Sequence, residues 1–390
     1  MNSNPQIRVN DKGRKRVLRG HPWVFRSDLE WEKEPPAGVI TLIDSKSKFL
    51  GIGLFSPHSQ ISIRMLSRHL EPVDELFWSK RLESALQLRD HLSIPSSARR
   101  LIHGEADGIP SFVLDQYGEA LSFQSLSMGI ESQRETLLKL IQEKLKPTLI
   151  VERNDVSVRN LEQLPQASQV LQGEGNVRQV IYEGDLKFEV HLLEGQKTGA
   201  FLDQRENRLQ AGELARNQKK VLDACAYQGW FSCHLAKQAE SVLAIDQSKS
   251  AVDQIKLNAQ LNQLQNIEAI EANVFDWFKE ADLKHEKFDL INLDPPAFVK
   301  SRHQLEAAMK GYKEVNLRAI KLLNPGGFLI SSSCSHHLSE EEFIQVLESA
   351  ARDAKRQLQI LKIGSQAMDH PQLLGFPESK YLKCLFLRVV

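Results

Sequence analysis

Short apolar runs alternate with helical patterns in the second half of the chain. The runs have the length and composition of buried strands and span residues 220–225, 242–246, 267–270, 288–293 and 328–332. Apolar residues at helical spacing predict helices over 232–238, 249–264, 304–323 and 340–358. Strands and helices that alternate in this way predict an α/β fold with a doubly wound parallel sheet. Two further strands, 359–363 and 380–389, close the pattern.

The first half of the chain has a different pattern. Up to residue 71, turn signals at 11–13 and 56–58 separate short strand-like runs, which predicts a small β-barrel-like domain with strands over 7–9, 23–25, 39–43, 49–55 and 61–66. Residues 72–182 predict a central α+β domain, with helices over 72–91 and 131–145, a hairpin within 100–126 and a strand over 148–152. We expect the doubly wound domain from 183 to 390, opening with a strand over 188–193.

Composition adds a few limits. Lys and Arg together number 50, as do Asp and Glu, so only local charge clusters can argue for nucleic acid. The four cysteines lack zinc-ligand spacing and are too few for a disulfide framework, which favours a reducing cytoplasm and predicts no metal. The N-terminus is polar and basic, and no apolar run is long enough to span a membrane, so we expect a soluble cytoplasmic protein.

A basic run with aromatic residues lies in the N-terminal domain. Trp23 and Phe25 fall among cations that outnumber the nearby acids; these cations are Arg8, Lys12, Arg14, Lys15, Arg16, Arg19 and Arg26. Cations hold phosphates and aromatic rings stack on bases, so the pattern is typical of an RNA-binding face. A solvated strand-and-turn surface explains it equally well.

The turn after the strand 220–225 has features of a nucleotide pocket. Gly229 opens the next helix and lets a ligand approach the backbone, and Asp246 closes the next strand, where it can accept the hydroxyls of a ribose. The dinucleotide fingerprint Gly-x-Gly-x-x-Gly is absent, and Trp230 stands where a second glycine would be expected. S-adenosyl-L-methionine, which has no pyrophosphate, therefore fits better than a nicotinamide dinucleotide.

Two neighbouring strands are followed by reactive groups. The segment 294–298, Asp-Pro-Pro-Ala-Phe, offers an acid that can hold an amine and an aromatic ring that can stack on a base. Cys334 follows the next strand beside His336 and His337, which favour a thiolate, and a thiolate suits attack on C6 of a pyrimidine before methyl transfer to C5. The structural alternatives are a strand-ending turn and a small buried cysteine. Both groups are expected at the carboxyl edge of one sheet, where such folds bind ligands.

With these motifs in place, the chain resembles the RlmI-type family of bacterial 23S ribosomal RNA cytosine-5 methyltransferases over nearly its whole length. The resemblance is carried by residues 19–25, 197–208, 294–298, 311–313, 333–335 and 369–371. It implies an N-terminal PUA domain that binds RNA, a central α+β domain and a C-terminal Rossmann-like class I methyltransferase domain that uses S-adenosyl-L-methionine. It also places Cys334 at the position of the nucleophile.

The motifs and the resemblance together define an expected site. We expect Cys334 and Asp294 to be catalytic, with Asp294 holding the cytosine. The expected cofactor ligands are Asp223, Tyr227, Gly229, Asp246, Asn273 and Asp294. The expected contacts to ribosomal RNA are Pro295, Pro296, Phe298, Lys197, Arg205, Arg14, Arg19 and Trp23. The sequence leaves open whether the protein forms a homodimer.

The chain departs from the family pattern around the cofactor. Residues 226–231 read Ala-Tyr-Gln-Gly-Trp-Phe where the family is closer to Ser-Tyr-Thr-Gly-Gly-Phe, Asn273 replaces an expected acid, and Asp223 replaces the usual Asn. Two alternatives therefore stay open. One is methylation of guanine at N7 or N2, which needs no thiolate, and the other is a non-catalytic RNA-binding factor in ribosome assembly. A nicotinamide dehydrogenase is a more distant alternative.

Overall fold

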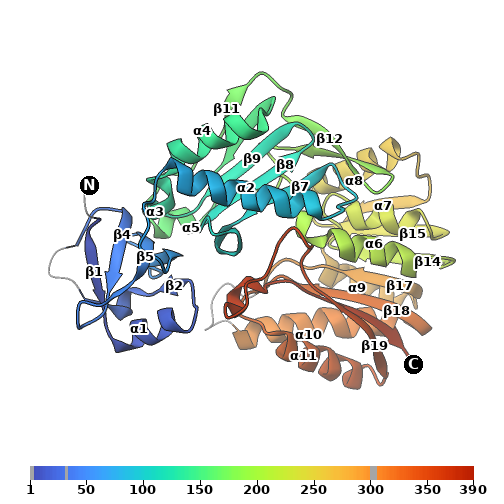
Figure 1. The fold of residues 1–390 in the computed structure, drawn as a ribbon. Coiled ribbons are helices and arrows are strands. Elements are labelled where there is room, and N and C mark those ends of the chain that lie inside the picture. The colour runs from blue at the N-terminus through green and yellow to red at the C-terminus, as the bar shows by residue number, and fades with distance from the viewer. Residues whose placement is uncertain (1–3, 31–33, 299–304) are drawn as a thin grey trace. The chain divides into compact units, whose positions relative to one another are not determined.

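The computed structural model describes residues 4–30, 34–298 and 305–390, which form two compact units (Figure 1). The first unit contains the chain up to Ile181 together with Val190–Leu202 and Met368–Ser379. The second contains Tyr182–Glu189, Asp203–Ala367 and Lys380–Val390. Two short segments that follow Ile181 in the sequence are thus part of the first unit. The three-domain division at residues 71 and 182 stays a prediction.

The N-terminal part of the first unit is a six-stranded sheet of order β2-β6-β5-β4-β1-β3. Its strands confirm the expected runs, and their bounds are β1 Gln6–Val9, β2 Trp23–Val24, β3 Leu29–Glu30, β4 Gly38–Ile43, β5 Phe49–Phe55 and β6 Ile63–Ser67. The turn expected at 11–13 is wrong, because a helix, α1 (Asp11–Leu18), begins there. The Asn10 side chain caps it by accepting from the Gly13 N–H at 3.0 Å, and Val17 is buried beneath it.

The central part of the first unit is a five-stranded sheet of order β11-β10-β9-β8-β7. The expected hairpin is confirmed as β8 (Phe112–Tyr117) and β9 (Ala120–Ser125), with β7 at Ala98–His103, β10 at Leu149–Arg153 and β11 at Ser168–Gly173. The helices are α2 (Glu75–His91), α3 (Met128–Glu131), α4 (Arg134–Leu145) and α5 (Val158–Leu161). Trp78 and Leu82 of α2 pack with Phe112 and Phe123 in one core. A hairpin of β12 (Arg178–Glu183) and β13 (Leu186–His191) follows, and its residues Tyr182–Glu189 belong to the second unit.

The second unit is built on a seven-stranded sheet of order β16-β15-β14-β17-β18-β20-β19. The pairings from β16 to β18 are parallel and β20 is antiparallel. The strands are β14 (Lys220–Ala224), β15 (Ser241–Asp246), β16 (Ile267–Glu271), β17 (Phe288–Leu293), β18 (Leu323–Ser333), β19 (Leu358–Gly364) and β20 (Lys383–Val389). The expected doubly wound α/β sheet is therefore confirmed.

Helices cover both faces of this sheet (Figure 1). They are α6 (Arg205–Leu214), α7 (Trp230–Ala236), α8 (Lys249–Leu261), α9 (Val274–Leu283), α10 (Leu305–Leu322) and α11 (Glu340–Asp353). Helix α9 was not expected from the sequence. The expected helix over 304–323 is confirmed as α10, and Gln304 lies outside the described residues.

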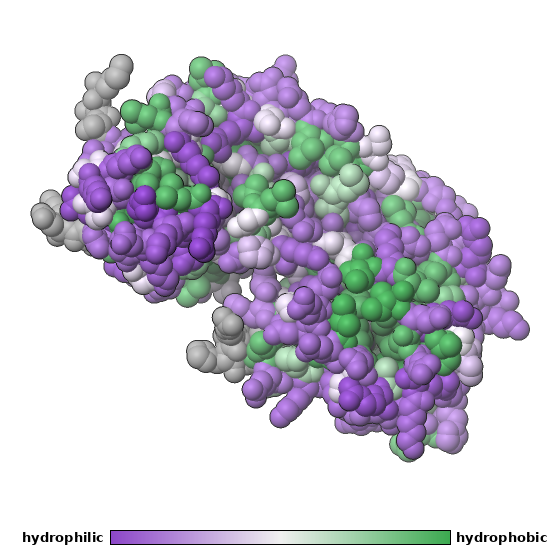
Figure 2. All heavy atoms as spheres, turned by 60° about the horizontal axis from the view of Figure 1, so that its bottom comes forward, coloured by the Kyte–Doolittle hydropathy of each residue, from purple (hydrophilic) through white to green (hydrophobic). Residues whose placement is uncertain are grey.

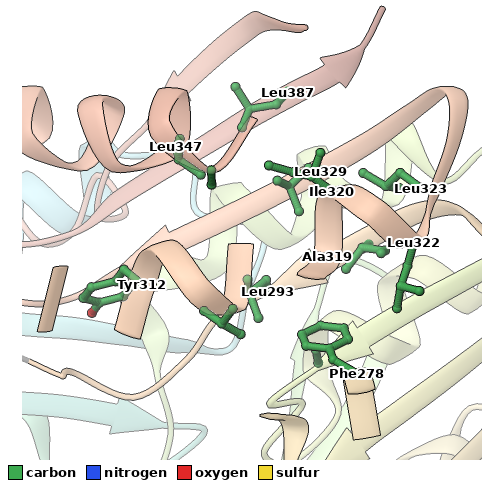
Figure 3. Close-up of a cluster of buried hydrophobic side chains, with 14 of the residues drawn as sticks. Phe278, Leu293, Tyr312, Ala319, Ile320, Leu322, Leu323, Leu329, Leu347 and Leu387 are labelled. Atoms are coloured by element: carbon green, nitrogen blue, oxygen red, sulfur yellow. The ribbon is translucent and has the colours of Figure 1, made fainter. Parts of the chain in front are cut away.

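The alternation of side chains along the strands explains the layering. Leu222, Ile291 and Leu329 pack on one face with α9, α10 and α11, and Val221 and Leu290 pack on the other face with α6 and α7. Figure 3 shows the first of these cores, where Phe278, Tyr312, Leu347 and Leu387 lie with the strand residues. Each fully buried Leu or Phe stabilises the fold by about 1.5–3 kcal/mol, so this core fixes the strand ends that follow it.

Apolar side chains are also exposed on the edge strand β19. Ile360, Leu361 and Ile363 each keep more than two fifths of their surface accessible. The face drawn in Figure 2 is mainly hydrophilic, with hydrophobic residues gathered in a few groups. Nothing in the structure identifies what such groups contact, so the expected possibility of a homodimer stays a prediction.

Candidate active site

The chain reverses its direction of travel across the sheet between β14 and β17. From β14 it proceeds to β15 and β16 on one side, and from β17 it proceeds to β18 on the other. Open α/β sheets bind ligands at the carboxyl edge beside such a switch point. Asp246 is the last residue of β15, and the segments that follow β14, β17 and β18 contain Cys225–Gly229, Asp294 and Cys334. The fold thus brings together the strand ends to which the sequence assigned chemistry.

The loop after β14 is tightly wound. Cys225, Tyr227 and Gly229 have φ values of 62°, 49° and 75°. The Gly229 N–H donates to the Ala226 carbonyl at 2.9 Å, and a Cβ at Gly229 would lie 2.9 Å from the side chain of Ile255. The turn therefore requires glycine at this position, both for its backbone conformation and for its close packing on α8.

Asp246 ties this loop to the end of β15. One carboxylate oxygen accepts from the Tyr227 N–H and the other from the Ser248 N–H, each at 2.9 Å. Each oxygen has a second lone pair, so the half-buried carboxylate can still accept from a ligand hydroxyl. Its position and spare acceptors match the role expected for it.

Asp223 is fully buried on β14, one strand residue before the loop. Its carboxylate accepts from the hydroxyl of Ser232 at 2.5 Å and from the side-chain amide of Asn292 at 2.8 Å. Burial raises its pKa to about 6, against the opposing effect of these hydrogen bonds. The side chain has no exposed surface, so its contribution to a ligand site is to hold the loop and α7 in place.

The acids gather around one point of the loop. Burial, followed by the carboxylates of Asp246, Asp294 and Asp223, raises the pKa of the Cys225 thiol. Three of the expected cofactor ligands therefore exert their negative charge on the same atom, the sulfur of Cys225. A site with this charge attracts a cation rather than a phosphate.

Asn273 stands at the start of α9. Its side-chain oxygen accepts from the N–H groups of Phe275, at 2.9 Å, and Asp276, at 3.4 Å, and so caps the helix. From the sequence, Asn273 is expected to be a cofactor ligand in place of an acid, which would use this oxygen as an acceptor. The cap already uses both of its lone pairs, which leaves the amide N–H₂ as the group that can meet a ligand.

Trp230 does not occupy the loop interior. Its ring stacks on Phe188 of β13 at a centroid distance of 4.5 Å, and the guanidinium of Arg208 of α6 lies 4.8 Å from its centroid. Arg208 is paired in turn with the buried carboxylate of Glu183, which also contacts His234 at 3.0 Å. The departure from a glycine at this position thus serves packing between β13, α6 and α7.

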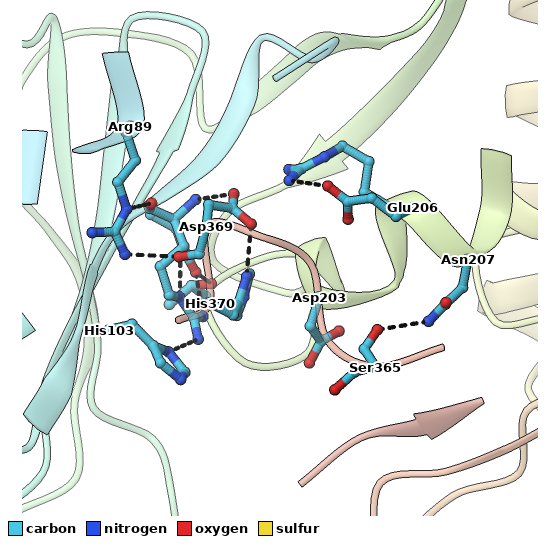
Figure 4. Close-up of polar contacts among 12 residues, drawn as sticks. Arg89, His103, Asp203, Glu206, Asn207, Ser365, Asp369 and His370 are labelled. Carbon is cyan, nitrogen blue, oxygen red and sulfur yellow. Dashed lines mark hydrogen bonds and ion pairs between the residues drawn. The ribbon is translucent and has the colours of Figure 1, made fainter. Parts of the chain in front are cut away.

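Asp294 follows β17 and is held by a chain of amides. Its carboxylate accepts from the Gln204 side chain at 3.0 Å, and Gln204 accepts from Asn207 at 2.6 Å. Asn207 also donates to the Ser365 carbonyl, as Figure 4 shows. Sequence reasoning missed Gln204 and Asn207 as positioning residues, although both lie within the matched motif 197–208.

The residues after Asp294 differ in their surroundings. Pro295 is buried and Pro296 is exposed. The ring of Phe298 packs on Tyr312 of α10, with centroids 4.6 Å apart, and on Phe275 at 6.1 Å. Phe298 is half-buried, so one part of its ring is committed to packing and the rest is accessible.

Cys334 follows β18 and is partly exposed. The residues on each side of it are fixed by Tyr312, whose hydroxyl lies 3.0 Å from the Ser333 hydroxyl and 2.9 Å from that of Ser335. The other three cysteines of the chain are unsuited to nucleophilic chemistry, because burial raises the pKa of Cys225 and raises that of Cys233 and Cys384 to about 12. His336 and His337, which were expected to favour the thiolate, are both exposed. The ring of His336 packs on Tyr381.

Arg205, which belongs to the second unit, is less available than expected. It is fully buried and pairs with Glu206 at 3.0 Å, so it has no surface that RNA can reach.

The remaining expected RNA contacts lie in the first unit. Lys197 and Arg19 are exposed, whereas Arg14 pairs with Asp44 at 3.4 Å. The ring of Trp23 packs on Phe376 with centroids 4.6 Å apart, and its indole N–H donates to the carboxylate of Glu105 at 2.7 Å. Their roles toward RNA stay predictions, and the geometry of Trp23 favours packing.

The motif 369–371 has a structural function in the first unit (Figure 4). Arg89 is fully buried, donates to both carboxylate oxygens of Asp107 at 2.6 and 2.8 Å, and donates to the Asp369 carbonyl at 2.7 Å. The Asp369 side chain accepts from the Arg100 N–H and contacts His370, each at 2.9 Å. These bonds attach Met368–Ser379 to the central sheet.

Within the described ranges, no cluster of three or more His, Cys, Asp or Glu side chains is arranged to hold a metal ion. Among the same residues, no helix is both long enough and apolar enough to cross a membrane.

The comparisons with known proteins agree with this geometry. A PUA-like domain model matches residues 7–68, and a methyltransferase domain model matches residues 215–373. Proteins named ribosomal RNA large subunit methyltransferase I from Yersinia pestis and Yersinia pseudotuberculosis are 39% identical over 97% of this chain and 98% of their own length. A solved chain from Streptococcus mutans, described as a SAM-dependent methyltransferase, has a TM-score of 0.85 at 22% identity and covers 99% of this chain and 100% of its own.

A second solved methyltransferase, in complex with S-adenosylhomocysteine, has a TM-score of 0.87 at 22% identity and the same coverage of both chains. These matches confirm the expected PUA-like domain, the expected Rossmann-like methyltransferase domain and S-adenosyl-L-methionine as its cofactor. Since curated relatives match at this identity over almost the whole length, the chain belongs to the ribosomal RNA large subunit methyltransferase I family.

Proposed function

We propose that this protein methylates C5 of a cytosine in the 23S RNA of the large ribosomal subunit, with Cys334 as a covalent nucleophile. The observation that carries the proposal is the placement of a partly exposed cysteine and of Asp294 after two adjacent parallel strands, β18 and β17. The names of the Yersinia relatives support ribosomal RNA as the substrate. A guanine methyltransferase would have no use for a cysteine at this position.

The loop after β14 fits S-adenosyl-L-methionine. This cofactor carries a sulfonium and an ammonium, and Asp223, Asp246 and Asp294 give the loop a negative potential. The turn at Gly229 has no space for a Cβ, and Asp246 retains acceptors suited to ribose hydroxyls. Bound there, the cofactor supplies an electrophilic methyl group and leaves as S-adenosylhomocysteine.

The chain's own residues activate the base. The Cys334 thiolate forms an Sγ–C6 bond, and the electron pair of the C5–C6 double bond then makes C5 nucleophilic. Asp294, fixed by Gln204, holds the N3 and N4 edge of a cytosine flipped out of the RNA. After C5 has accepted the methyl group, a base takes the C5 proton, the C5–C6 double bond re-forms and the Sγ–C6 bond breaks to release the thiolate.

RNA is held in part by the first unit. Lys197 and Arg19 are exposed cations suited to phosphate contacts, and the PUA-like match supports an RNA-binding role for residues 7–68. Arg14 can contribute only when it leaves its ion pair with Asp44.

The first test is methyl transfer from labelled S-adenosyl-L-methionine to 23S RNA from cells that lack this protein, followed by nucleoside analysis. Label in 5-methylcytidine is expected. Label in a modified guanosine would exclude Cys334 as the nucleophile. If neither free RNA nor intact subunits acquire label, the protein is an RNA-binding assembly factor without this activity.

The second test separates Cys334 from the rest of the site. A Cys334→Ala variant should lose methyl transfer and should still bind S-adenosyl-L-methionine by calorimetry. Cys233→Ala is the matched control, because Cys233 is buried in α7 and should not affect the reaction. Normal turnover by Cys334→Ala would exclude the covalent mechanism.

A further inference from the structure

A buried lysine lies beside the segment that contains Cys334. Lys383 is the first residue of β20 and pairs in register with Ser333 of β18. Its residue surface is 2% exposed, and its ammonium donates to the carbonyl oxygens of Ser335, at 2.7 Å, and Tyr381, at 2.9 Å. The charge is therefore held against the backbone immediately after Cys334.

Lys383 has no carboxylate within ion-pair distance in the part of the chain that the structure describes. Two carbonyl oxygens accept two of its three protons but do not neutralise the buried charge, and such a charge is costly without an anion nearby. The nearby lysine in the same loop differs, because Lys380 is partly exposed and pairs with Glu340 at 2.6 Å. An unpaired buried ammonium at this position calls for a separate explanation.

The sulfur of Cys334 is the anion that acts most strongly on this ammonium. Burial lowers the pKa of Lys383 to about 8, and the Cys334 thiolate opposes that effect more than any other charged group. Glu340 and Glu342 act in the same direction more weakly. A thiolate at Cys334 and the ammonium of Lys383 therefore stabilise each other electrostatically.

Tyr312 holds the other side of the same segment. Burial raises the pKa of its phenol, and its hydroxyl contacts both serines beside Cys334. A neutral Tyr312 does not compete with the thiolate for the ammonium. The charged groups that act on Lys383 besides Cys334 are Lys380, Glu340 and Glu342. Tyr312 on α10 and Tyr381 before β20 contact the same segment, His336 and His337 follow Cys334 in the chain, and Asp294 acts on Cys384 beside Lys383.

We propose that the Lys383 ammonium stabilises the thiolate of Cys334, so that Lys383 is a positioning residue for the nucleophile. The inference rests on the proposed role of Cys334. The thiol proton leaves to solvent, and the ammonium remains beside the sulfur until the Sγ–C6 bond forms. When that bond breaks, the same ammonium stabilises the thiolate that leaves C6, which favours release of the methylated base.

The test measures the reactivity of Cys334 without RNA or cofactor. Iodoacetamide alkylation of the full-length protein is followed by mass spectrometry of the peptide that contains Cys334, over a range of pH. In the unmodified sequence the alkylation midpoint should lie below about 8.5, the value of a free thiol. Lys383→Met should raise the midpoint by about 1 pH unit or more, because an adjacent opposite charge shifts a titration by about that amount.

Two variants serve as controls. Lys383→Arg retains the charge and should restore most of the low-pH reactivity, whereas a merely structural lysine would give no such rescue. Lys380→Met removes a lysine of the same loop that is partly exposed and already paired with Glu340, and it should shift the midpoint much less than Lys383→Met. An unchanged midpoint in folded Lys383→Met would overturn the proposal. If that variant fails to fold, a midpoint at or above about 8.5 in the unmodified sequence overturns it instead.

These outcomes are independent of the product of methyl transfer. If Lys383→Met shifts the midpoint but the label is found in a modified guanosine, Lys383 stabilises the Cys334 thiolate but that thiolate does not take part in methyl transfer. Label in 5-methylcytidine together with an unshifted midpoint would preserve the covalent mechanism and show that Lys383 does not support it.

Discussion

The buried carboxylate of Asp223 gives the sharpest prediction about stability. It is fully buried, and moving its pKa from 3.8 to about 6 corresponds to a cost of about 3 kcal/mol at neutral pH. The folded state binds the Asp223 carboxyl proton more tightly than the unfolded state does. The loss of folding stability is therefore absent below pH 3.8 and complete above about pH 6. Stability therefore falls as the pH rises through this window.

An Asp223→Asn variant removes that charge and retains hydrogen-bonding groups toward Ser232 and Asn292. Whatever the altered hydrogen bonds cost, that cost does not depend on pH. The free energy of unfolding of the variant, relative to the unmodified protein, should therefore rise by about 1.5 kcal/mol between pH 5 and pH 8. Urea unfolding at the two pH values measures this difference.

Asp289 provides a matched control on the neighbouring strand β17. It is half-buried. Burial is the largest single influence on its pKa and raises it, but hydrogen bonds from Asn324 and from the N–H groups of Lys219 and Lys220 together outweigh burial and hold the pKa below its usual value. Relative to the unmodified protein, Asp289→Asn should therefore be destabilised above pH 3.8, show no change of that difference between pH 5 and pH 8, and lose the difference as the pH falls below 3.8. If Asp223→Asn shows no relative gain between pH 5 and pH 8, the reasoning from burial is wrong.

Further predictions concern the packing around the site. Glu183→Gln leaves the buried Arg208 without its counter-charge and should cost about 3–5 kcal/mol in urea unfolding at pH 7. The pKa of Glu183 is lowered to about 2, so the stability it contributes in the unmodified protein should be lost as the pH falls from 4.5 toward 2, which thermal unfolding will show. Trp230→Ala should cost about 3–5 kcal/mol, while calorimetry should give a dissociation constant for S-adenosyl-L-methionine within a few-fold of the original, because the ring packs away from the loop. Gly229→Ala should lower the thermal midpoint and weaken cofactor binding, since its Cβ would collide with Ile255; unchanged binding would show that the turn can relax.

The sequence alone determined the architecture of the second unit. Strand β17 begins and ends where its apolar run does, and β14, β15 and β16 differ from their predicted bounds by one residue. The reason is physical: strands covered on both faces must be continuously apolar, so their pattern is visible without tertiary information. The reactive groups at the strand ends were equally visible, because strand direction in a parallel sheet fixes the edge at which they lie.

Local signals were weaker where polar residues form helices. The first turn of α1 reads as a turn because Asp, Lys and Gly favour both structures, and only the cap from Asn10 and the burial of Val17 decide for a helix. Helix α9 was missed beside Asn273 for a related reason. The same amide oxygen can cap a helix or meet a ligand, and the sequence does not distinguish the two uses.

Only the tertiary structure decided how side chains are used. Trp230 packs on Phe188 and Arg208, Arg205 is buried, and Lys383 meets the Cys334 segment through a strand pairing that joins residues far apart in the chain. Each of these depends on which segments become neighbours. Residue type and spacing fix what chemistry a side chain can perform, but its burial and partners come from contacts distant in sequence, and these determine which of its abilities the protein uses.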